Sequence, residues 1–330
     1  MNPVHPFDAI IEPLKCSVCP GDVLVANFIW CKEADHSMPE LPEVQTVVDT
    51  LCHAGIIGRH IVGVEVNWSK TISDQTPESF TRCMKGLVIT SIRRRGKYII
   101  FDFDASLSLL IHLRMTGRLL VTSNAEPISK HVQVVLHLSD NRCLHFHDTR
   151  KFGRMQLTKR PAAVLDRLGP EPLSPKFTAR QFQKALLSRK RCLKPLLLDQ
   201  TFIAGLGNIY VDEALWASKI HPLRISSTLA DHEIKMLHRA IRKVLRKGLQ
   251  NNGTSLGGSK TNFISADHKQ GRNQLQLNVF RHTNRPCPRC RNKIKRIIVG
   301  QRSSHICETC QSPPHSSTDL VDDPSANVTR

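Results

Sequence analysis

The 330-residue sequence is short of acidic residues, has no long apolar run and has no lysine or arginine before Lys15. It holds 28 acidic residues against 47 lysines and arginines, a formal net charge of +19 that favours a polyanionic partner such as nucleic acid. The lack of a long apolar run excludes a membrane-spanning helix, and the missing early basic region argues against a signal peptide. We therefore expect a cytoplasmic protein with no membrane partner.

The first 37 residues do not share this basic character. They contain two lysines and five acids, so the excess positive charge lies entirely in the rest of the chain. We expect residues 1–37 to be an extension that is disordered or that follows a wrongly assigned start codon.

The run Met38-Pro39-Glu40 resembles the true beginning of a protein. If Met38 were removed, Pro39 would carry a free secondary amine with the Glu40 carboxylate beside it. Such an amine can attack a sugar carbon and form an iminium intermediate, whereas an internal proline nitrogen is an amide and cannot. The alternative interpretation is that Pro39 and Pro42 merely bracket the start of a helix.

The spacing of apolar residues predicts one helix over 42–52 and then a series of short strands. The expected strands span 61–66, 87–92, 98–103, 107–113, 118–121, 132–138, 143–147 and 154–157. Many short strands separated by turn residues indicate a β-sandwich. After residue 170 the pattern changes to helices, expected over 178–187, 193–198, 209–219 and 229–249. The fold class is therefore α+β with several domains.

Four cysteines near the end of the chain have the spacing of a zinc ribbon. They are Cys287, Cys290, Cys307 and Cys310, two C-x2-C pairs separated by 16 residues. Four thiolates close the tetrahedral shell of one Zn2+ ion, so we expect a structural ion that holds a β-hairpin. A nucleobase deaminase would also need His-x-Glu, which occurs nowhere in the chain. The basic residues between the pairs, Arg302 among them, are placed to hold DNA phosphates.

Other segments also suggest contacts with DNA. Asn208 follows two glycines at a helix start, where its amide and the backbone N–H groups suit a phosphate; the third glycine of a dinucleotide loop is missing. Arg150 and Phe152 are two apart and project from one side of an extended segment. With Met115 from a probable turn, they are expected to fill the gap left by a base rotated out of a duplex. Lys97 follows a basic turn and is expected to contact phosphate.

Together these motifs resemble the formamidopyrimidine-DNA glycosylase (Fpg/MutM) family, in order and across nearly all of 38–311. The resemblance rests on the following segments: Pro39-Glu40-Leu41-Pro42-Glu43, Arg95-Gly96-Lys97-Tyr98, His112-Leu113-Arg114-Met115-Thr116-Gly117, Arg150-Lys151-Phe152-Gly153, 205–210, Ile220-His221-Pro222 and the cysteines. It implies a β-sandwich, a helix-two-turn-helix module and a β-hairpin zinc ribbon. The resemblance further implies double-stranded DNA with oxidised bases or abasic sites as the partner.

The resemblance also implies chemistry in base-excision repair. The Pro39 amine would attack C1′ of the damaged nucleotide and expel an oxidised purine such as 8-oxoguanine or a formamidopyrimidine. The Schiff base would undergo β,δ-elimination, the lyase reaction, with Glu40 as proton donor. Lys97, Asn208 and Arg302 would bind phosphates. By the same matching Lys194 would lie in the DNA site and Glu43 would support the pocket.

The expected organisation follows from these motifs. It is an extension over 1–37, a catalytic β-sandwich domain over 38–165, a helix-two-turn-helix domain over 170–262, a lesion-recognition loop with a connecting strand over 263–282, a zinc ribbon over 283–311 and a disordered tail over 312–330. The sequence carries no oligomerisation signal, so we expect a monomer.

Two features depart from the family pattern. The extension acylates the Pro39 nitrogen, so a non-catalytic protein that binds damaged DNA is the alternative function if the extension is retained. The recognition loop has Arg272-Asn273 after its glycine, where many relatives carry an aromatic pair. The order of lesion preference is therefore not predicted.

Overall fold

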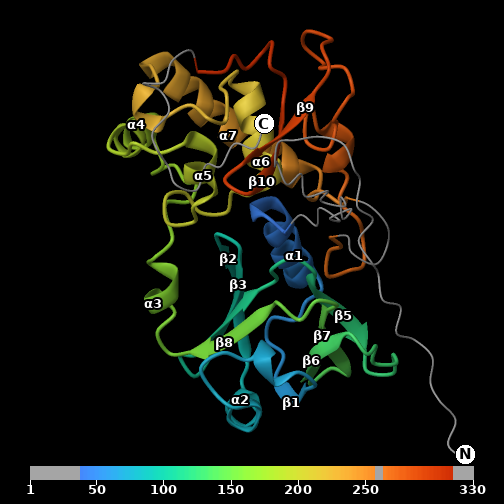
Figure 1. Cartoon of the computed structure of the whole chain (residues 1–330). Coiled ribbons are helices and arrows are strands. Elements are labelled where there is room, and N and C mark those ends of the chain that lie inside the picture. Colours follow the sequence, from blue (N-terminus) through green and yellow to red (C-terminus); the bar gives the residue numbers. More distant parts are fainter. Residues whose placement is uncertain (1–37, 257–262, 315–330) are drawn as a thin grey trace, which may run out of the picture. The chain divides into compact units, whose positions relative to one another are not determined.

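The computed structural model describes residues 38–256 and 263–314 (Figure 1). The expected extension over 1–37 and most of the expected tail, residues 315–330, lie outside the described residues. Within the described ranges, no helix is both long and apolar enough to cross a membrane.

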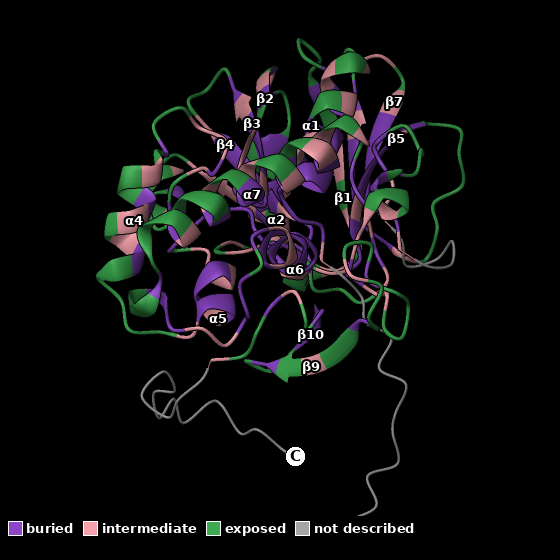
Figure 2. Cartoon of the chain, turned by 90° about the horizontal axis from the view of Figure 1, so that it is seen from above, coloured by how far each residue is buried: buried purple, intermediate pink, exposed green. Residues whose placement is uncertain are grey.

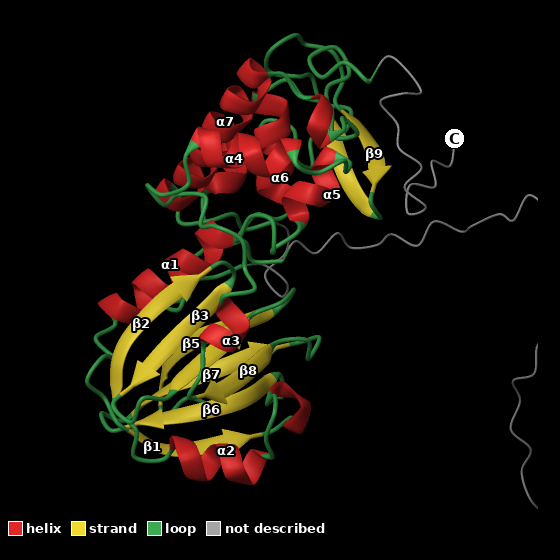
Figure 3. Ribbon diagram, turned by 90° about the vertical axis from the view of Figure 1, so that its left-hand side faces the viewer, coloured by secondary structure: helices red, strands yellow, loops and turns green. Residues whose placement is uncertain are grey.

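Two four-stranded antiparallel sheets form the β-sandwich that the sequence predicts (Figure 3). One sheet has the strand order β1-β6-β7-β5 and the other has the order β2-β3-β4-β8. The strands are β1 (Ile61–Val66), β2 (Ile89–Arg95), β3 (Tyr98–Phe103), β4 (Ser108–His112), β5 (Gly117–Ser123), β6 (Val132–Leu138), β7 (Arg142–Asp148) and β8 (Arg154–Thr158). All eight agree with the expected strands to within a few residues at their ends.

Helix α1 (Leu41–His53) contributes to two apolar cores. Val44, Val47 and Leu51 pack with the sandwich, whereas Leu41 packs with the helices that follow residue 170. The start of α1 therefore lies where the two cores meet. Helix α2 (Pro77–Met84), which the sequence analysis missed, begins with proline, and the Thr76 hydroxyl accepts a hydrogen bond from Ser79 N.

The chain between residue 158 and Gln250 forms helices joined by loops. The helices are α3 (Ala162–Leu165), α4 (Ala179–Leu187), α5 (Leu193–Leu198), α6 (Asn208–Ala217) and α7 (Asp231–Gln250). Helix α6 is apolar around most of its circumference and is buried among the others (Figure 2). A helix with this composition is stable only when other elements pack against all of its sides. This packing holds the N-terminal end of α6 in one position.

Strands β9 (Lys295–Val299) and β10 (Arg302–Ile306) form the expected hairpin. Gly300 and Gln301 connect them with φ of +54° and +58°, the backbone of a tight two-residue turn. The next residue, Arg302, therefore stands at the hairpin tip.

The connecting strand expected within 263–282 is not present. This segment instead contains a 3-10 helix, η3 (Asn273–Gln276), followed by turns. Its end is held by Glu213 of α6, whose carboxylate accepts hydrogen bonds from the backbone N–H groups of Asn278, Val279 and Phe280. Those N–H groups are satisfied by a side chain, so pairing with a strand is not needed.

Candidate active site

The Glu40 carboxylate is bound at the N-terminus of helix α6. Its Oε1 accepts a hydrogen bond from Ile209 N at 2.8 Å, and its Oε2 accepts one from Tyr210 N at 3.4 Å. Free N–H groups at a helix N-terminus attract a negative charge. From the sequence, these N–H groups were expected to bind a DNA phosphate. The structure gives them to Glu40, the residue directly after Pro39.

Two glycines make this close approach possible. A Cβ atom at Gly207 would lie 2.4 Å from Cδ of Glu40, and one at Gly205 would lie 2.8 Å from Cβ of Leu41. Gly205 also has φ of +86°, which favours glycine. Gly205 and Gly207, which resembled part of a phosphate-binding loop, are therefore needed because a larger residue at either position would collide with the start of α1.

Burial raises the pKa of Glu40 to about 7, although nearby Lys97 and the two backbone hydrogen bonds oppose the shift. Only 1% of Glu40 is exposed. A carboxyl group with this pKa is protonated about half of the time at pH 7, which suits a general acid. Lys97 thus lies close enough to Glu40, the residue after Pro39, to interact with it electrostatically.

Lys97 is buried and interacts electrostatically with Glu40, Glu43 and Arg302. Burial is the main cause that lowers the pKa of its ammonium group. The turn before it is held by Glu171, whose carboxylate accepts the Gly96 N–H at 2.6 Å. Two arginines of strand β2 bind the same carboxylate.

The Glu43 carboxylate stabilises the start of α1 through hydrogen bonds. Its Oε2 accepts the Glu40 N–H at 2.9 Å, and its Oε1 accepts the Tyr210 hydroxyl at 2.8 Å and the Thr254 N–H at 2.7 Å. Burial raises the pKa of Glu43, and these three donors oppose the shift. Both carboxylates at the α1 N-terminus therefore accept hydrogen bonds from donors of the protein.

The three side chains expected to fill the void of a flipped base lie together. Arg150 donates to Sδ of Met115 at 3.6 Å, and its guanidinium carbon lies 4.9 Å from the centre of the Phe152 ring. Phe152 is 45% exposed, an unusual state for phenylalanine. These residues, which we call the wedge, present an apolar and cationic surface to solvent.

Asp148 holds both turns that carry the wedge. Its Oδ1 is hydrogen-bonded to the Thr116 hydroxyl and accepts the Arg150 N–H at 3.2 Å, while its Oδ2 accepts the Gly153 N–H at 2.7 Å. Asp148 is completely buried. The sequence carries no signal of this role, because an aspartate two residues before Arg150 is equally compatible with a charged loop residue.

The remaining DNA candidates meet at the hairpin. Asn208 donates its amide to Ser303 O at 3.0 Å, and the Nζ atom of Lys194 donates to the same oxygen at 2.8 Å. Lys194 has no exposed surface and is paired with Asp212, whereas Arg302 beside Ser303 is exposed. Arg302 is therefore accessible to solvent, whereas Lys194 is buried against the backbone of the next residue, Ser303.

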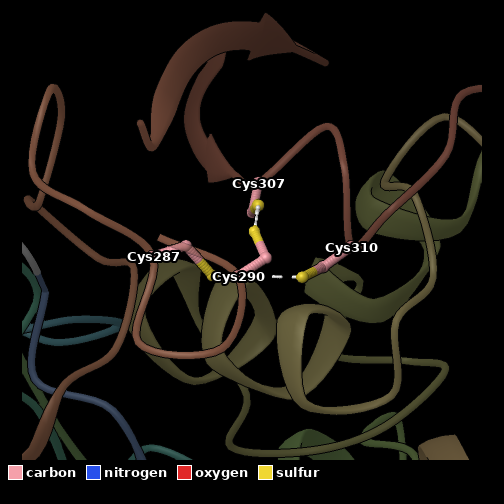
Figure 4. Close-up of side chains that lie close together, drawn as sticks. All are labelled: Cys287, Cys290, Cys307 and Cys310. Carbon is pink, nitrogen blue, oxygen red and sulfur yellow. Dashed lines mark hydrogen bonds between the residues drawn. The ribbon is translucent and has the colours of Figure 1, made fainter. Parts of the chain in front are cut away.

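The four cysteines converge on one point (Figure 4). Their sulfur atoms all lie within 4.8 Å of one another, and the set comprises Cys287, Cys290, Cys307 and Cys310. Trp216 of α6 donates its indole N–H to the Cys287 sulfur at 3.4 Å, which orients that ligand from outside the cluster. Four thiolates at this spacing fit one tetrahedral structural zinc ion, with no position left open for catalysis.

Three family models match the chain. They are the formamidopyrimidine-DNA glycosylase N-terminal domain over residues 38–155, the formamidopyrimidine-DNA glycosylase H2TH domain over 168–259, and the zinc finger found in FPG and IleRS over 285–313. The first match begins at Met38, the residue before the proposed nucleophile. The third covers all four cysteines.

Relatives and solved structures agree with these models. The chain is 46% identical over 274 residues to the formamidopyrimidine-DNA glycosylase of Protochlamydia amoebophila, covering 83% of this chain and 99% of the relative. The Herpetosiphon aurantiacus enzyme of the same name is 44% identical, with 83% and 100% covered. A Lactococcus lactis FPG variant bound to Fapy-dG containing DNA has a TM-score of 0.77 at 35% identity, with 83% and 100% covered. MutM bound to DNA containing carbocyclic 8-oxo-G has a TM-score of 0.76 at 35% identity, with the same coverage. The chain belongs to the formamidopyrimidine-DNA glycosylase family.

Proposed function

We propose that this protein, which by family is a DNA glycosylase of base-excision repair, removes oxidised purines through a Schiff base at Pro39 and then cleaves the strand as a lyase. The observation that carries the proposal is the position of Glu40. It follows Pro39, it is buried at the N-terminus of α6, and its pKa is about 7. A proton donor is thus fixed beside the candidate nucleophile. The substrates are 8-oxoguanine and formamidopyrimidines in double-stranded DNA.

The reaction requires Pro39 to be the first residue, so that its nitrogen is a secondary amine. That nitrogen forms a bond to C1′ while the bond from C1′ to the damaged base breaks, and the proton that the amine loses leaves with the base. Protonated Glu40 then gives its proton to the ring oxygen O4′, the sugar opens, and an iminium joins C1′ to Pro39. Successive loss of protons from C2′ and C4′ expels the 3′ and 5′ phosphates, and water hydrolyses the iminium.

The DNA contacts divide into phosphate binding and base replacement. Lys97, Asn208 and Arg302 bind backbone phosphates, and the exposure of Arg302 at the hairpin tip supports its part in this role. The wedge of Met115, Arg150 and Phe152 fills the space left by the flipped base. Lys194 is buried, so its effect on DNA passes through Ser303, next to Arg302.

The protein acts as a monomer in the cytoplasm, at the nucleoid where its substrate lies. A non-catalytic protein that binds damaged DNA is not favoured, because the relatives described above are named as glycosylases. We propose that the domain boundaries predicted from the sequence separate the functional domains of the protein. The family match from residue 38 onward supports the start of the catalytic domain.

Borohydride trapping tests the proposal. A protein that begins at Pro39 is incubated with an 8-oxoguanine duplex, and the reduced crosslink is mapped by mass spectrometry. We expect a crosslink at the Pro39 nitrogen and cleaved DNA. The matched control retains residues 1–38 and therefore has an amide at this nitrogen, so it should bind the duplex without crosslinking. A crosslink at any lysine, or none with bound DNA, contradicts the proposal.

A further inference from the structure

The recognition loop is anchored to the protein by the buried side chain of Asn273. This residue opens the 3-10 helix η3 and is 3% exposed, whereas Leu275 two residues later is 77% exposed. The Asn273 N–H donates to Gly253 O at 3.0 Å, and the Asn251 amide donates to Oδ1 of Asn273 at 3.4 Å. The loop thus directs one polar side chain inward and presents an apolar side chain to solvent.

The backbone around this anchor is closely packed. A Cβ atom at Gly271 would lie 2.2 Å from Gly253 O, and Gly253 itself has φ of +80°. The Arg272 N–H donates to Asn251 O at 2.8 Å. The loop and the segment 251–254 are therefore packed directly against each other, with no room for an extra atom between them.

From Asn273 a chain of hydrogen bonds runs to Glu43. The Asn273 Nδ2 lies 2.9 Å from Oγ1 of Thr254, that hydroxyl lies 3.2 Å from the Tyr210 hydroxyl, and the latter lies 2.8 Å from Oε1 of Glu43. The amide nitrogen can only donate, so the Thr254 hydrogen is left to point at Tyr210 and the Tyr210 hydrogen at Glu43. All donors in the chain therefore point toward the carboxylate.

The far end of this chain is the catalytic pair. The second oxygen of Glu43 accepts the N–H of Glu40, the peptide nitrogen that follows Pro39. We propose that Asn273 is a positioning residue that couples the seating of the recognition loop to the orientation of Glu40 and Pro39. The inference rests on the proposed function.

Three variants separate this role from simple packing. Asn273→Leu removes the donor at similar volume, Asn273→Asp replaces the donating nitrogen with an accepting oxygen, and Thr254→Val breaks the next link without altering the loop sequence. Lys235→Ala, at an exposed position of helix α7 outside the recognition loop, is the control. Each is made in the protein that begins at Pro39, and its single-turnover excision of 8-oxoguanine is measured against enzyme concentration.

We expect Asn273→Leu and Thr254→Val each to lower the maximal rate by about tenfold while the half-saturating enzyme concentration changes by less than about twofold. Asn273→Asp should lose at least as much, and Lys235→Ala should keep the maximal rate. The double variant Asn273→Leu/Thr254→Val should lose no more than either single variant, because both break one chain.

Additive losses in the double variant, or a change confined to the half-saturating concentration, would overturn the coupling. If Asn273→Leu does not fold, Thr254→Val alone decides, and a wild-type rate for it also overturns the coupling. The unaltered protein is trapped with borohydride in the same experiment. No crosslink at its Pro39 removes the proposed function and this inference together, whereas a normal crosslink with normal variants removes only the inference.

Discussion

The Nζ atom of Lys194 lies 2.6 Å from Oδ1 of Asp212, and neither side chain has more than 1% of its surface exposed. Lys194 also donates to Ser303 O, and the other oxygen of Asp212 accepts the His305 N–H at 2.9 Å. The pair therefore joins α5 and α6 to strand β10. It lies directly beneath Arg302, the residue proposed to bind phosphate.

Lys194→Met should destabilise the protein strongly. It leaves the Asp212 carboxylate buried without its cation, which typically costs about 3–5 kcal/mol of unfolding free energy. Adding Asp212→Leu should restore part of this loss, because no uncompensated charge then remains buried. Chemical denaturation of both variants measures the difference. Lys190→Met, at an exposed position in the same region, should have the stability of the parent, and an equally stable Lys194→Met would refute the assignment.

The salt dependence of DNA binding should distinguish Arg302 from Lys194. Each phosphate contact that is lost lowers the slope of log affinity against log salt by about 1. We expect Arg302→Ala to lower the slope by this amount. The Lys194→Met/Asp212→Leu double variant should keep the parental slope, since a buried lysine releases no counterion from DNA. A reduced slope in the double variant would mean that Lys194 contacts a DNA phosphate directly.

The rate of strand cleavage should fall at alkaline pH, because Glu40 must be protonated to donate to the ring oxygen and open the sugar. With a Glu40 pKa of about 7, the single-turnover rate should decline above pH 7 and approach a loss of about tenfold per pH unit. Lys97 lowers the pKa of Glu40, so Lys97→Met should move this decline to higher pH. The measurement is a pH–rate profile. Lys85→Met, an exposed lysine away from the site, should leave the profile in place.

Phe152 is expected to support base flipping by replacing the stacking of the extruded base. Removing one aromatic stacking contact costs about 1–3 kcal/mol, so Phe152→Ala should slow excision from an intact 8-oxoguanine duplex by about 10- to 100-fold. On a duplex that already carries an abasic site, no base must leave the stack. The variant should therefore lose less of its rate of strand cleavage on that duplex. Leu187→Ala removes a similarly exposed apolar side chain from helix α4 and should change neither rate. Equal losses on both substrates would contradict the role of the wedge.

The sequence predicted the elements of this fold better than it predicted the contacts between them. The strands and the cysteine array have local patterns, of alternation and of spacing, and these patterns reached the correct sandwich and zinc ribbon. The position of Lys194 was not predictable in this way. Its burial depends on Asp212 and Ser303, which lie far away in the sequence and carry no local signal of pairing.

The glycines at 205 and 207 show the same limit. Two glycines before a helix indicate that something approaches the backbone closely, and DNA phosphate was a reasonable interpretation. The group that approaches is Glu40, about 170 residues earlier in the chain. Only the packing of Leu41 among the later helices brings the two together.

Loss of zinc should abolish DNA binding while leaving the β-sandwich folded. The four thiolates hold the hairpin that carries Arg302, whereas the sandwich has its own apolar core and contains none of these cysteines. We expect about one zinc ion per chain, and Cys290→Ser should lose it because a serine hydroxyl is a poor zinc ligand. Zinc content, DNA affinity and thermal unfolding are measured together. Cys83→Ser, an exposed cysteine outside the cluster, should retain both metal and affinity. If Cys290→Ser lost zinc yet bound DNA normally, the hairpin would not be part of the DNA-binding surface.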